Sequence, residues 1–232
     1  MKQKIIYKFI NIIIFILIIL GLGIFFYPNV CHYLYQREVK KINKFYLERI
    51  DNYDNSDLED LYNAIKAYNQ ELYESKQVKL VDAFSYEQVD FSLLEFGFNE
   101  EIIGYLDIPN INVVLPVYLG ASKTNIDRGA AHLTQSSLPI GGNNTNSVIV
   151  AHRGMVTAEM FRHLDKLEIG DKIYFTNFYE ELVYSVYDIK IIDPDDINAI
   201  LIQSGKDLLT LMTCHPYGAD TSRYLVFAKR LN

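Results

Sequence analysis

The stretch TLMTCHPYGADTSRYLVFAKR, residues 210–230, contains two apolar runs with a polar loop between them. Each run has the length and composition of a β-strand, and the loop contains Pro and Gly, which are typical of turns. Cys214 ends the first run, and Arg223 stands directly before the second. The stretch therefore predicts two neighbouring strands with a thiol and a guanidinium at one end.

Similar short β-type runs fill the chain from residue 102 onward, and turn-forming sequences separate them. In chain order the seven runs are IIGYLDI, NVVLPVYL, SVIVAH, KIYFTNF, LVYSVYDIKII, LLTLMTC and YLVFAKRL. Two short helices are expected near residues 157–165 and 195–203. This pattern predicts a mainly β fold, a closed or nearly closed barrel of about eight strands.

An apolar run, FINIIIFILIILGLGIFFY, occupies residues 9–27, and Asn11 is its one clearly polar member. A helix of this length crosses a bilayer core of about 30 Å. Lys2, Lys4 and Lys8 precede the run, so a signal peptide is the alternative. The run exceeds the usual apolar length of a signal peptide, and no small-residue cleavage site follows it. We therefore expect an uncleaved transmembrane anchor.

The segment between the anchor and the barrel is polar and favours helix. Within LEDLYNAIKAYNQELY, apolar residues recur every three or four positions, which predicts a helix packed on the main body by one face. These residues are Leu58, Leu61, Ile65, Tyr68 and Leu72. The chain thus divides into an N-terminus, an anchor, a helical segment, an irregular segment and a barrel, at 1–8, 9–27, 28–75, 76–97 and 98–232.

Composition excludes several classes of protein. The formal net charge of −7 argues against a nucleic-acid binder, because a phosphate backbone requires clustered Lys and Arg. The two cysteines, Cys31 and Cys214, form no disulfide framework. A bond between them is conceivable, but Cys31 adjoins the anchor, so we expect Cys214 to be a free thiol. The spacings C-x-x-C and H-x-x-x-H are absent from the sequence, so neither a metal nor a cofactor is expected.

A catalytic cysteine requires a partner for proton transfer, and the chain contains five histidines. His152 ends the strand-like run SVIVAH, and a turn follows it, so it should lie at a strand end as Cys214 does. His215 adjoins Cys214, but successive strand side chains alternate between faces, so His215 should face away. The other three are His32 beside the anchor, His132 as a satisfied half-buried residue, and His163 on a surface helix.

These motifs resemble the sortases, the membrane-anchored cysteine transpeptidases of Gram-positive bacteria. TLMTC (210–214), followed by Arg223, resembles the family signature T-L-x-T-C … R. HLTQSSLPIGGNNTNSVIVAHRG (132–154) resembles the stretch that leads into the catalytic histidine. MFRHLDKLEIGDKIY and LLTLMTCHPYGADTSRYLV are similar to class C, the pilin-polymerising branch. The resemblance covers about residues 76–232 and implies a sortase-like closed β-barrel.

The resemblance implies a role for each of three residues. Cys214 would attack the Thr–Gly bond of an LPxTG-like sorting signal and form a thioacyl-enzyme. His152 would protonate the leaving amine and then deprotonate the incoming amine, which in class C is a pilin lysine. Arg223 would hold the substrate and stabilise the oxyanion, and its charge should also favour the Cys214 thiolate. The partners would be pilins or surface proteins with such signals, and the catalytic domain would lie outside the cell, with the N-terminus inside.

Class C sortases also carry a lid with an Asp-Pro-aromatic motif over the active site. The matching stretch here is VDAFS, which gives Asp82 and Phe84, with Ala83 in the position of the proline. By the resemblance, Asp82 would pair with Arg223, and Phe84 would cover Cys214. An ordinary loop is the alternative.

Three features depart from the class C pattern. Asp220 stands where relatives often have Asn, and His215 replaces a more usual small hydroxyl residue. The sequence ends at Asn232, whereas many class C members have a second transmembrane helix after the barrel. These departures concern the pilus assignment and not the transpeptidase chemistry. Two alternative functions are a sortase that anchors surface proteins to the cell-wall precursor, and a catalytically silent, membrane-tethered binding module, against which the intact Cys214, His152 and Arg223 argue.

Overall fold

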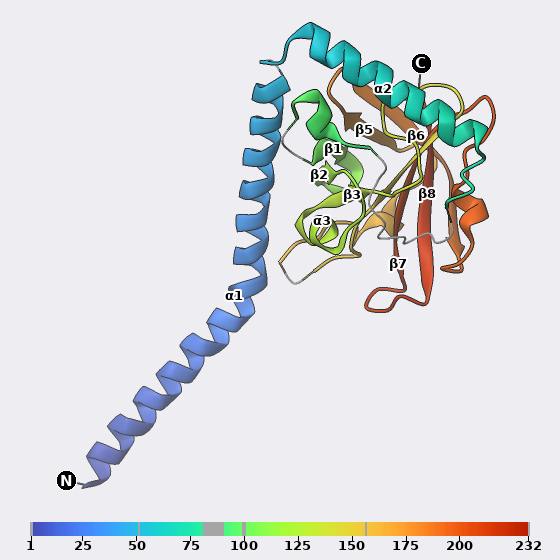
Figure 1. The fold of residues 1–232 in the computed structure, drawn as a ribbon. Coiled ribbons are helices and arrows are strands. Elements are labelled where there is room, and N and C mark those ends of the chain that lie inside the picture. Colours follow the sequence, from blue (N-terminus) through green and yellow to red (C-terminus); the bar gives the residue numbers. More distant parts are fainter. Residues whose placement is uncertain (1, 51, 81–90, 99–100, 156, 232) are drawn as a thin grey trace.

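The structure is a computed structural model that describes residues 2–50, 52–80, 91–98, 101–155 and 157–231. A closed barrel of eight strands forms its main body, and two long helices precede the barrel in the chain (Figure 1). The predicted fold class, a mainly β closed barrel after an N-terminal helical part, is confirmed.

The order of strands around the barrel is β1-β2-β3-β4-β7-β8-β6-β5, and β5 closes the barrel on β1. Neighbouring strands are antiparallel except for the parallel pairs β2–β3 and β4–β7. The strands are β1 Ile102–Ile108, β2 Val113–Tyr118, β3 Ala130–His132, β4 Thr145–Val150, β5 Lys172–Thr176, β6 Glu181–Ile192, β7 Asp207–His215 and β8 Ser222–Arg230. Seven of them correspond to the predicted runs, and the three-residue strand β3 is additional.

The two short helices expected after β4 and β6 are single 3-10 turns, so the predicted ranges are too long. They are η3 Leu164–Lys166 and η4 Ile197–Ile200. Met160 has a φ of 43°, a left-handed conformation that interrupts helical backbone inside 157–165. After η4, Leu201 is already extended, with φ −65° and ψ 151°. The other short elements are η1 Leu93–Phe96, η2 Pro109–Ile111 and the helix α3 Lys123–Arg128.

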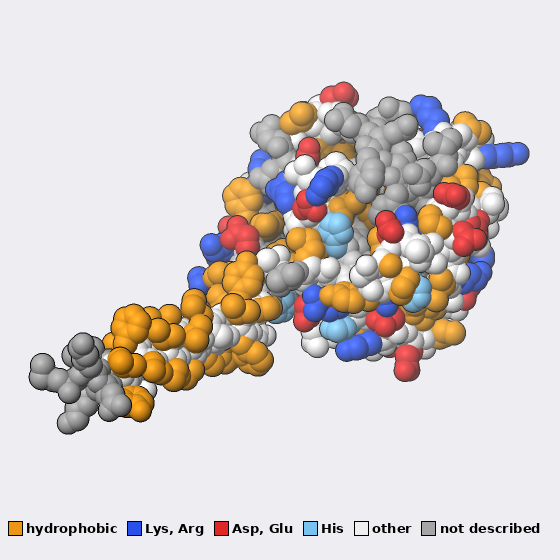
Figure 2. Space-filling view, turned by 90° about the horizontal axis from the view of Figure 1, so that it is seen from below, with side chains coloured by type: hydrophobic (Ala, Val, Ile, Leu, Met, Phe, Trp, Pro, Cys, Tyr) orange, Lys and Arg blue, Asp and Glu red, His pale blue; other side chains and the backbone are white. Residues whose placement is uncertain are grey.

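Helix α1, Lys2–Ile50, is continuous from the apolar run to the barrel. Its first part projects from the body, and Figure 2 shows apolar side chains around this projecting part. Its last part packs on the barrel and buries Val39 and Tyr46. Among the described residues, one helix, Ile6–Ile50, is long and apolar enough to cross a membrane, which is compatible with the expected anchor.

Helix α2, Asn55–Glu74, buries Leu61, Ile65 and Leu72 against the barrel, as its apolar stripe predicts. The buried Asn69 fastens the same face by two hydrogen bonds to the backbone of Leu138. Its Nδ2 donates to the carbonyl oxygen at 2.9 Å, and its Oδ1 accepts from the N–H at 2.7 Å. Helix α2 is therefore fixed to the loop that leads into β4.

Apolar side chains pack on both faces of one part of the barrel wall. The first cluster takes residues from all eight strands, for example Leu106, Ile149 and Leu211, so it fills the barrel interior. The second, which we call the outer cluster, lies on the other face of β4, β7 and β8. It consists of Leu80, Ala121, Ile126, Ala131, Leu133, Val148, Val150, Ile200, Met212, Leu225 and Phe227.

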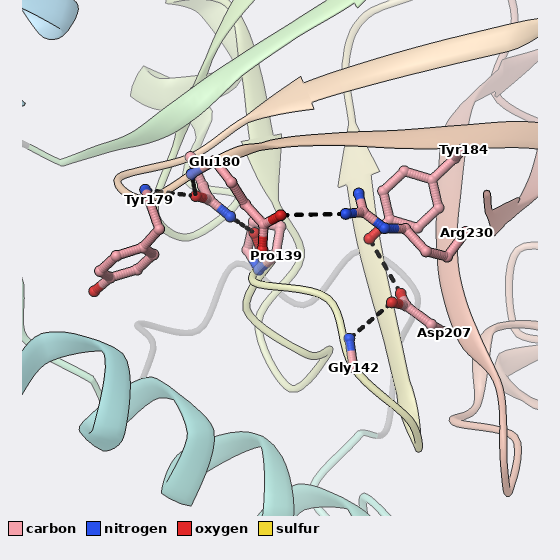
Figure 3. A network of polar contacts seen from close by, with 8 residues as sticks. Pro139, Gly142, Tyr179, Glu180, Tyr184, Asp207 and Arg230 are labelled. Atoms are coloured by element: carbon pink, nitrogen blue, oxygen red, sulfur yellow. Dashed lines mark hydrogen bonds and ion pairs between the residues drawn. The ribbon is translucent and has the colours of Figure 1, made fainter. Parts of the chain in front are cut away.

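A polar network fixes the end of the barrel at which β7 begins (Figure 3). The carboxylate of Asp207, the first residue of β7, accepts hydrogen bonds from the Gly142 N–H at 2.7 Å and from the Tyr184 hydroxyl at 3.1 Å. Arg230, at the end of β8, lies 3.3 Å from Glu180. Cys214 lies near the opposite end of β7. This network therefore stabilises the end of the barrel that is distant from Cys214.

Candidate active site

Cys214 and Arg223 are direct partners across the antiparallel pair β7–β8. Side chains of opposed residues project from the same face of a sheet, so the thiol and the guanidinium lie side by side. The Arg223 Nη1 also donates to the carbonyl oxygens of Asp220, at 2.7 Å, and Ser222, at 3.1 Å. The loop between the strands thus orients the guanidinium next to Cys214.

His152 reaches the same place from strand β4, which runs parallel to β7. The register pairs Val150 with Met212, and the Ala151 N–H continues the contact by donating to the Met212 carbonyl at 3.3 Å. The Thr213 hydroxyl also donates to the Ala151 carbonyl oxygen at 2.8 Å, so His152, just past the end of β4, follows a residue that is bound to the part of β7 next to Cys214.

The outer cluster identifies the face on which Cys214 and Arg223 lie. Val150 of β4, Met212 of β7 and Leu225 of β8 all belong to that cluster. Because side chains alternate along a strand, Cys214 of β7 and Arg223 of β8 continue this face at the rim of the outer cluster. His152 lies two residues past Val150, the last residue of β4, and so follows the end of the strand next to β7. The structure therefore places the three residues at the same end of the sheet.

His215 lies on the opposite face from Cys214, as strand alternation predicts. Its Nδ1 accepts a hydrogen bond of 2.6 Å from Nη1 of the buried Arg153, and its ring centroid is 5.9 Å from that of Tyr224. Arg153 also forms an ion pair of 3.2 Å with Asp165. The residue after His152 is thus tied to the residue after Cys214, which holds the ends of β4 and β7 together.

The surroundings of Cys214 shift the pKa of its thiol in opposite directions. Its burial raises the pKa of the thiol above the ordinary value, the Arg223 charge lowers it, and the Asp220 charge raises it. The stabilisation of the thiolate that the sequence predicts from Arg223 is present, but burial outweighs it. A cysteine has an ordinary pKa of about 8.5, so near neutral pH the thiol is mostly protonated, and a base must remove its proton.

Asp127, on α3, contacts the imidazole of His152, and the sequence analysis missed this residue. Its Oδ1 lies 2.9 Å from His152 Nε2, and its Oδ2 accepts from Lys123 Nζ at 2.8 Å. These hydrogen bonds lower the pKa of Asp127, with Lys123 the larger cause. The signal in the sequence was the Lys-to-Asp spacing of four residues, which indicates a helical ion pair but not a site.

His132 is fully buried in β3 rather than half-buried, and it is not part of the site. Its Nε2 lies 3.1 and 3.0 Å from the carbonyl oxygens of Ser136 and Ser137. Burial lowers the pKa of His132 to about 4, so the ring stays neutral and serves the packing of this loop. His163 adjoins the turn η3 and is half-buried, and His32 lies on α1.

Other sequence predictions concern the lid, the thiols and metals. Asp82 and Phe84 lie outside the described residues. Cys31 and Cys214 are both free cysteines, as expected. In the described part of the chain, no group of three or more His, Cys, Asp or Glu residues is arranged to hold a metal ion.

Comparison with known proteins gives one family. A family model described as "Sortase domain" matches residues 106–231. Sortase D of Bacillus subtilis is 34% identical over 131 residues, and this alignment spans 55% of the chain and 63% of that protein. The Streptococcus pneumoniae sortase C, whose crystal structure is described as giving insights into pilin substrate specificity, is 37% identical. It matches with a TM-score of 0.75 over 83% of this chain and 97% of that one. A structure described as the lid-mutant of Streptococcus agalactiae sortase C1 is 33% identical, with a TM-score of 0.72 over 80% and 94% of the two chains.

Proposed function

The chain belongs to the sortase family, and from this premise we propose that it is a class C cysteine transpeptidase acting on LPxTG-like sorting signals. The observation that carries the proposal is the cross-strand pair of Cys214 and Arg223, with His152 at the end of the adjoining parallel strand. A catalytically silent binding module would have no need of a thiol, a cation and an imidazole at one rim.

The first half-reaction forms a thioester on Cys214. The thiol passes its proton to His152, which becomes the imidazolium, and Sγ attacks the carbonyl carbon of the Thr–Gly bond to give a tetrahedral oxyanion. Arg223, the cation beside the thiol, donates to that oxyanion, which is the type of stabilisation that such intermediates require. The C–N bond then breaks, and imidazolium His152 gives its proton to the leaving Gly nitrogen.

The second half-reaction transfers the acyl group to an amine. His152, now neutral, removes a proton from the incoming amine as its nitrogen attacks the thioester carbon. The C–S bond breaks, and the departing Cys214 sulfur takes the proton back from His152, which restores the starting thiol. The product is a new amide bond, so no net hydrolysis takes place.

The proposed acceptor is the ε-amine of a pilin lysine, and similarity to the pneumococcal sortase C supports this choice. In the test, the full-length protein in detergent is incubated with an LPxTG-like peptide and with equal amounts of two competing acceptor peptides. One acceptor offers a lysine ε-amine and the other a glycine α-amine. We expect the ε-amine product to dominate in a mass-spectrometric count. Dominance of the α-amine product would support the alternative, a sortase that anchors proteins to the cell-wall precursor.

The proposed location is the cell membrane, with α1 as a single-pass anchor. Residues 1–8 would lie in the cytoplasm, 9–27 in the bilayer, and the barrel outside the cell, where pilins and surface proteins are assembled. The continuity of α1 between its apolar and barrel-packed parts supports this arrangement.

The proposed lid is the segment that contains Asp82 and Phe84, and its support is the sequence motif and the lid-mutant relative. A partly exposed ion pair from Asp82 contributes only about 0–1 kcal/mol, whereas full burial of a Phe contributes about 1.5–3 kcal/mol. Phe84→Ala should therefore speed labelling of Cys214 by a small thiol reagent more than Asp82→Ala does. Both variants would be made in a protein that also carries Cys31→Ser, so that Cys214 is the one thiol that the reagent can label. Unchanged labelling rates in both variants would show that 82–84 is an ordinary loop.

A further inference from the structure

We propose that Asp127 is a positioning residue that holds Nε2–H of His152, so that Nδ1 is the nitrogen that exchanges protons during catalysis. The inference deepens the proposed function and rests on it for the role of His152. It concerns which of the two chemically distinct ring nitrogens of His152 exchanges protons during catalysis.

The contact between the two side chains is short and comes from separate elements. Asp127 Oδ1 lies 2.9 Å from His152 Nε2, and the two residues are 25 positions apart in the chain. Their side chains are 41% and 40% exposed, so neither is enclosed by packing. Among the described residues, the carboxylate of Asp127 is the side-chain hydrogen-bond partner of this imidazole.

Helix α3 places the carboxylate at the rim of the outer cluster. Ile126, the residue before Asp127, is 3% exposed and belongs to that cluster. Ser122 caps the helix, because its Oγ accepts from the Asn125 N–H at 3.2 Å. The position of Asp127 is therefore set by a buried neighbour and a capped turn.

Lys123 occupies the other carboxylate oxygen. Its Nζ donates to Asp127 Oδ2 at 2.8 Å, which leaves Oδ1 for the histidine. Because its two hydrogen-bond partners lower the pKa of Asp127, the carboxyl is ionised throughout the neutral range. An ionised carboxylate only accepts hydrogen bonds, so the hydrogen of the 2.9 Å contact belongs to His152 Nε2.

This assignment fixes the tautomer. A neutral imidazole carries one N–H, so when it lies on Nε2, Nδ1 is the base. In the imidazolium, Nδ1–H is the acid that protonates the leaving amine, and Nε2–H stays with Asp127 in both half-reactions. The backbone after His152 is also held, because the buried Arg153 is tied to Asp165 and His215. Rotation of the imidazole is then the remaining freedom, and Asp127 restricts it.

The direct test determines which ring nitrogen of His152 carries the hydrogen. NMR spectroscopy detects this tautomer without any catalytic turnover. Full-length protein labelled with ¹⁵N-histidine in detergent would be studied by two-bond ¹H–¹⁵N correlation at mildly alkaline pH, with His152→Ala to assign the signals. We expect the Nε2–H form of His152 in the native protein and a mixture of both forms in Asp127→Asn. An Nδ1–H form in the native protein, or no change in the variant, would overturn the inference.

The kinetic test compares matched carboxylates. General acid–base catalysis contributes about 10²–10⁴-fold, and a residue that orients the acid–base group should account for part of it, so Asp127→Asn should lower kcat about tenfold with KM unchanged. Asp127→Glu should recover part of that loss. Asp188 is the control, because it pairs with Lys190 at 3.1 Å and is 39% exposed, close to Asp127. Asp188→Asn should change neither kcat nor the tautomer.

The outcomes separate the two proposals. If the native protein has the Nε2–H tautomer but transfers no peptide, the proposed function fails, and the positioning by Asp127 stands. If the native protein transfers peptide and Asp127→Asn has full kcat, the positioning inference fails, and the proposed function stands.

Discussion

Cys214→Ala is expected to reduce peptide transfer to the uncatalysed background while the barrel stays folded. The thioester cannot form without Sγ, and no other group on the barrel rim takes over its role in the proposed mechanism. Cys214 is half-buried near the end of β7, outside both apolar clusters, so loss of its sulfur leaves the core intact. Product formation by chromatography and thermal unfolding of both proteins would measure the two effects.

Cys31 supplies the matched control for this variant. It is the other free cysteine and lies on α1, so Cys31→Ala should keep the native rate. Transfer that persists in Cys214→Ala, or that disappears in Cys31→Ala, would show that the nucleophile has been assigned to the wrong residue.

His152→Ala should lower kcat/KM by about 10²–10⁴-fold, the usual contribution of general acid–base catalysis. His152 follows Ala151, whose N–H donates to the Met212 carbonyl of β7 at 3.3 Å, two residues before Cys214. His215→Ala should lose far less, because His215 lies on the opposite face and is bound to Arg153. Steady-state rates of both variants with the same peptide and amine would compare them.

His163 is a suitable control histidine, since it is half-buried near η3 and has no part in the proposed chemistry. His163→Ala should keep the native rate. Equal losses in His152→Ala and His215→Ala would mean that both faces of β7 contribute, which the strand-alternation argument does not allow.

The barrel could be predicted because most of its strands are apolar runs between turn residues. Strand β3 escaped detection because Ala130–His132 is too short to show an alternating pattern. Its existence depends on pairing with two longer strands, β2 and β4, which is a tertiary effect.

The candidate site could be predicted as far as its residues stand at the ends of strong strand runs. Cys214 and Arg223 flank one loop, so their cross-strand pairing follows from local sequence. Asp127 could not be predicted in this way, because it lies on α3, a helix of only six residues. Its contact with His152 joins positions 25 residues apart. Such a contact depends on how α3 packs on the outer cluster, which no periodicity in the sequence reveals.

The acidity of Cys214 was the least predictable feature. The sequence places a cation nearby, which favours the thiolate, and also reveals Asp220, which opposes it. Burial is the largest influence on the pKa of Cys214, and it arises from the packing of the folded site. The charges of neighbouring residues therefore predict only part of the pKa shift of Cys214.

The most direct test of the proposed chemistry is the intact mass of the native protein after incubation with an LPxTG-like peptide and no added amine. We expect a covalent adduct with the mass of the peptide up to its Thr, mapped to Cys214 by peptide sequencing and released by a lysine ε-amine. An adduct on another residue, or no adduct under conditions where the peptide is cleaved, would contradict a thioacyl-enzyme on Cys214.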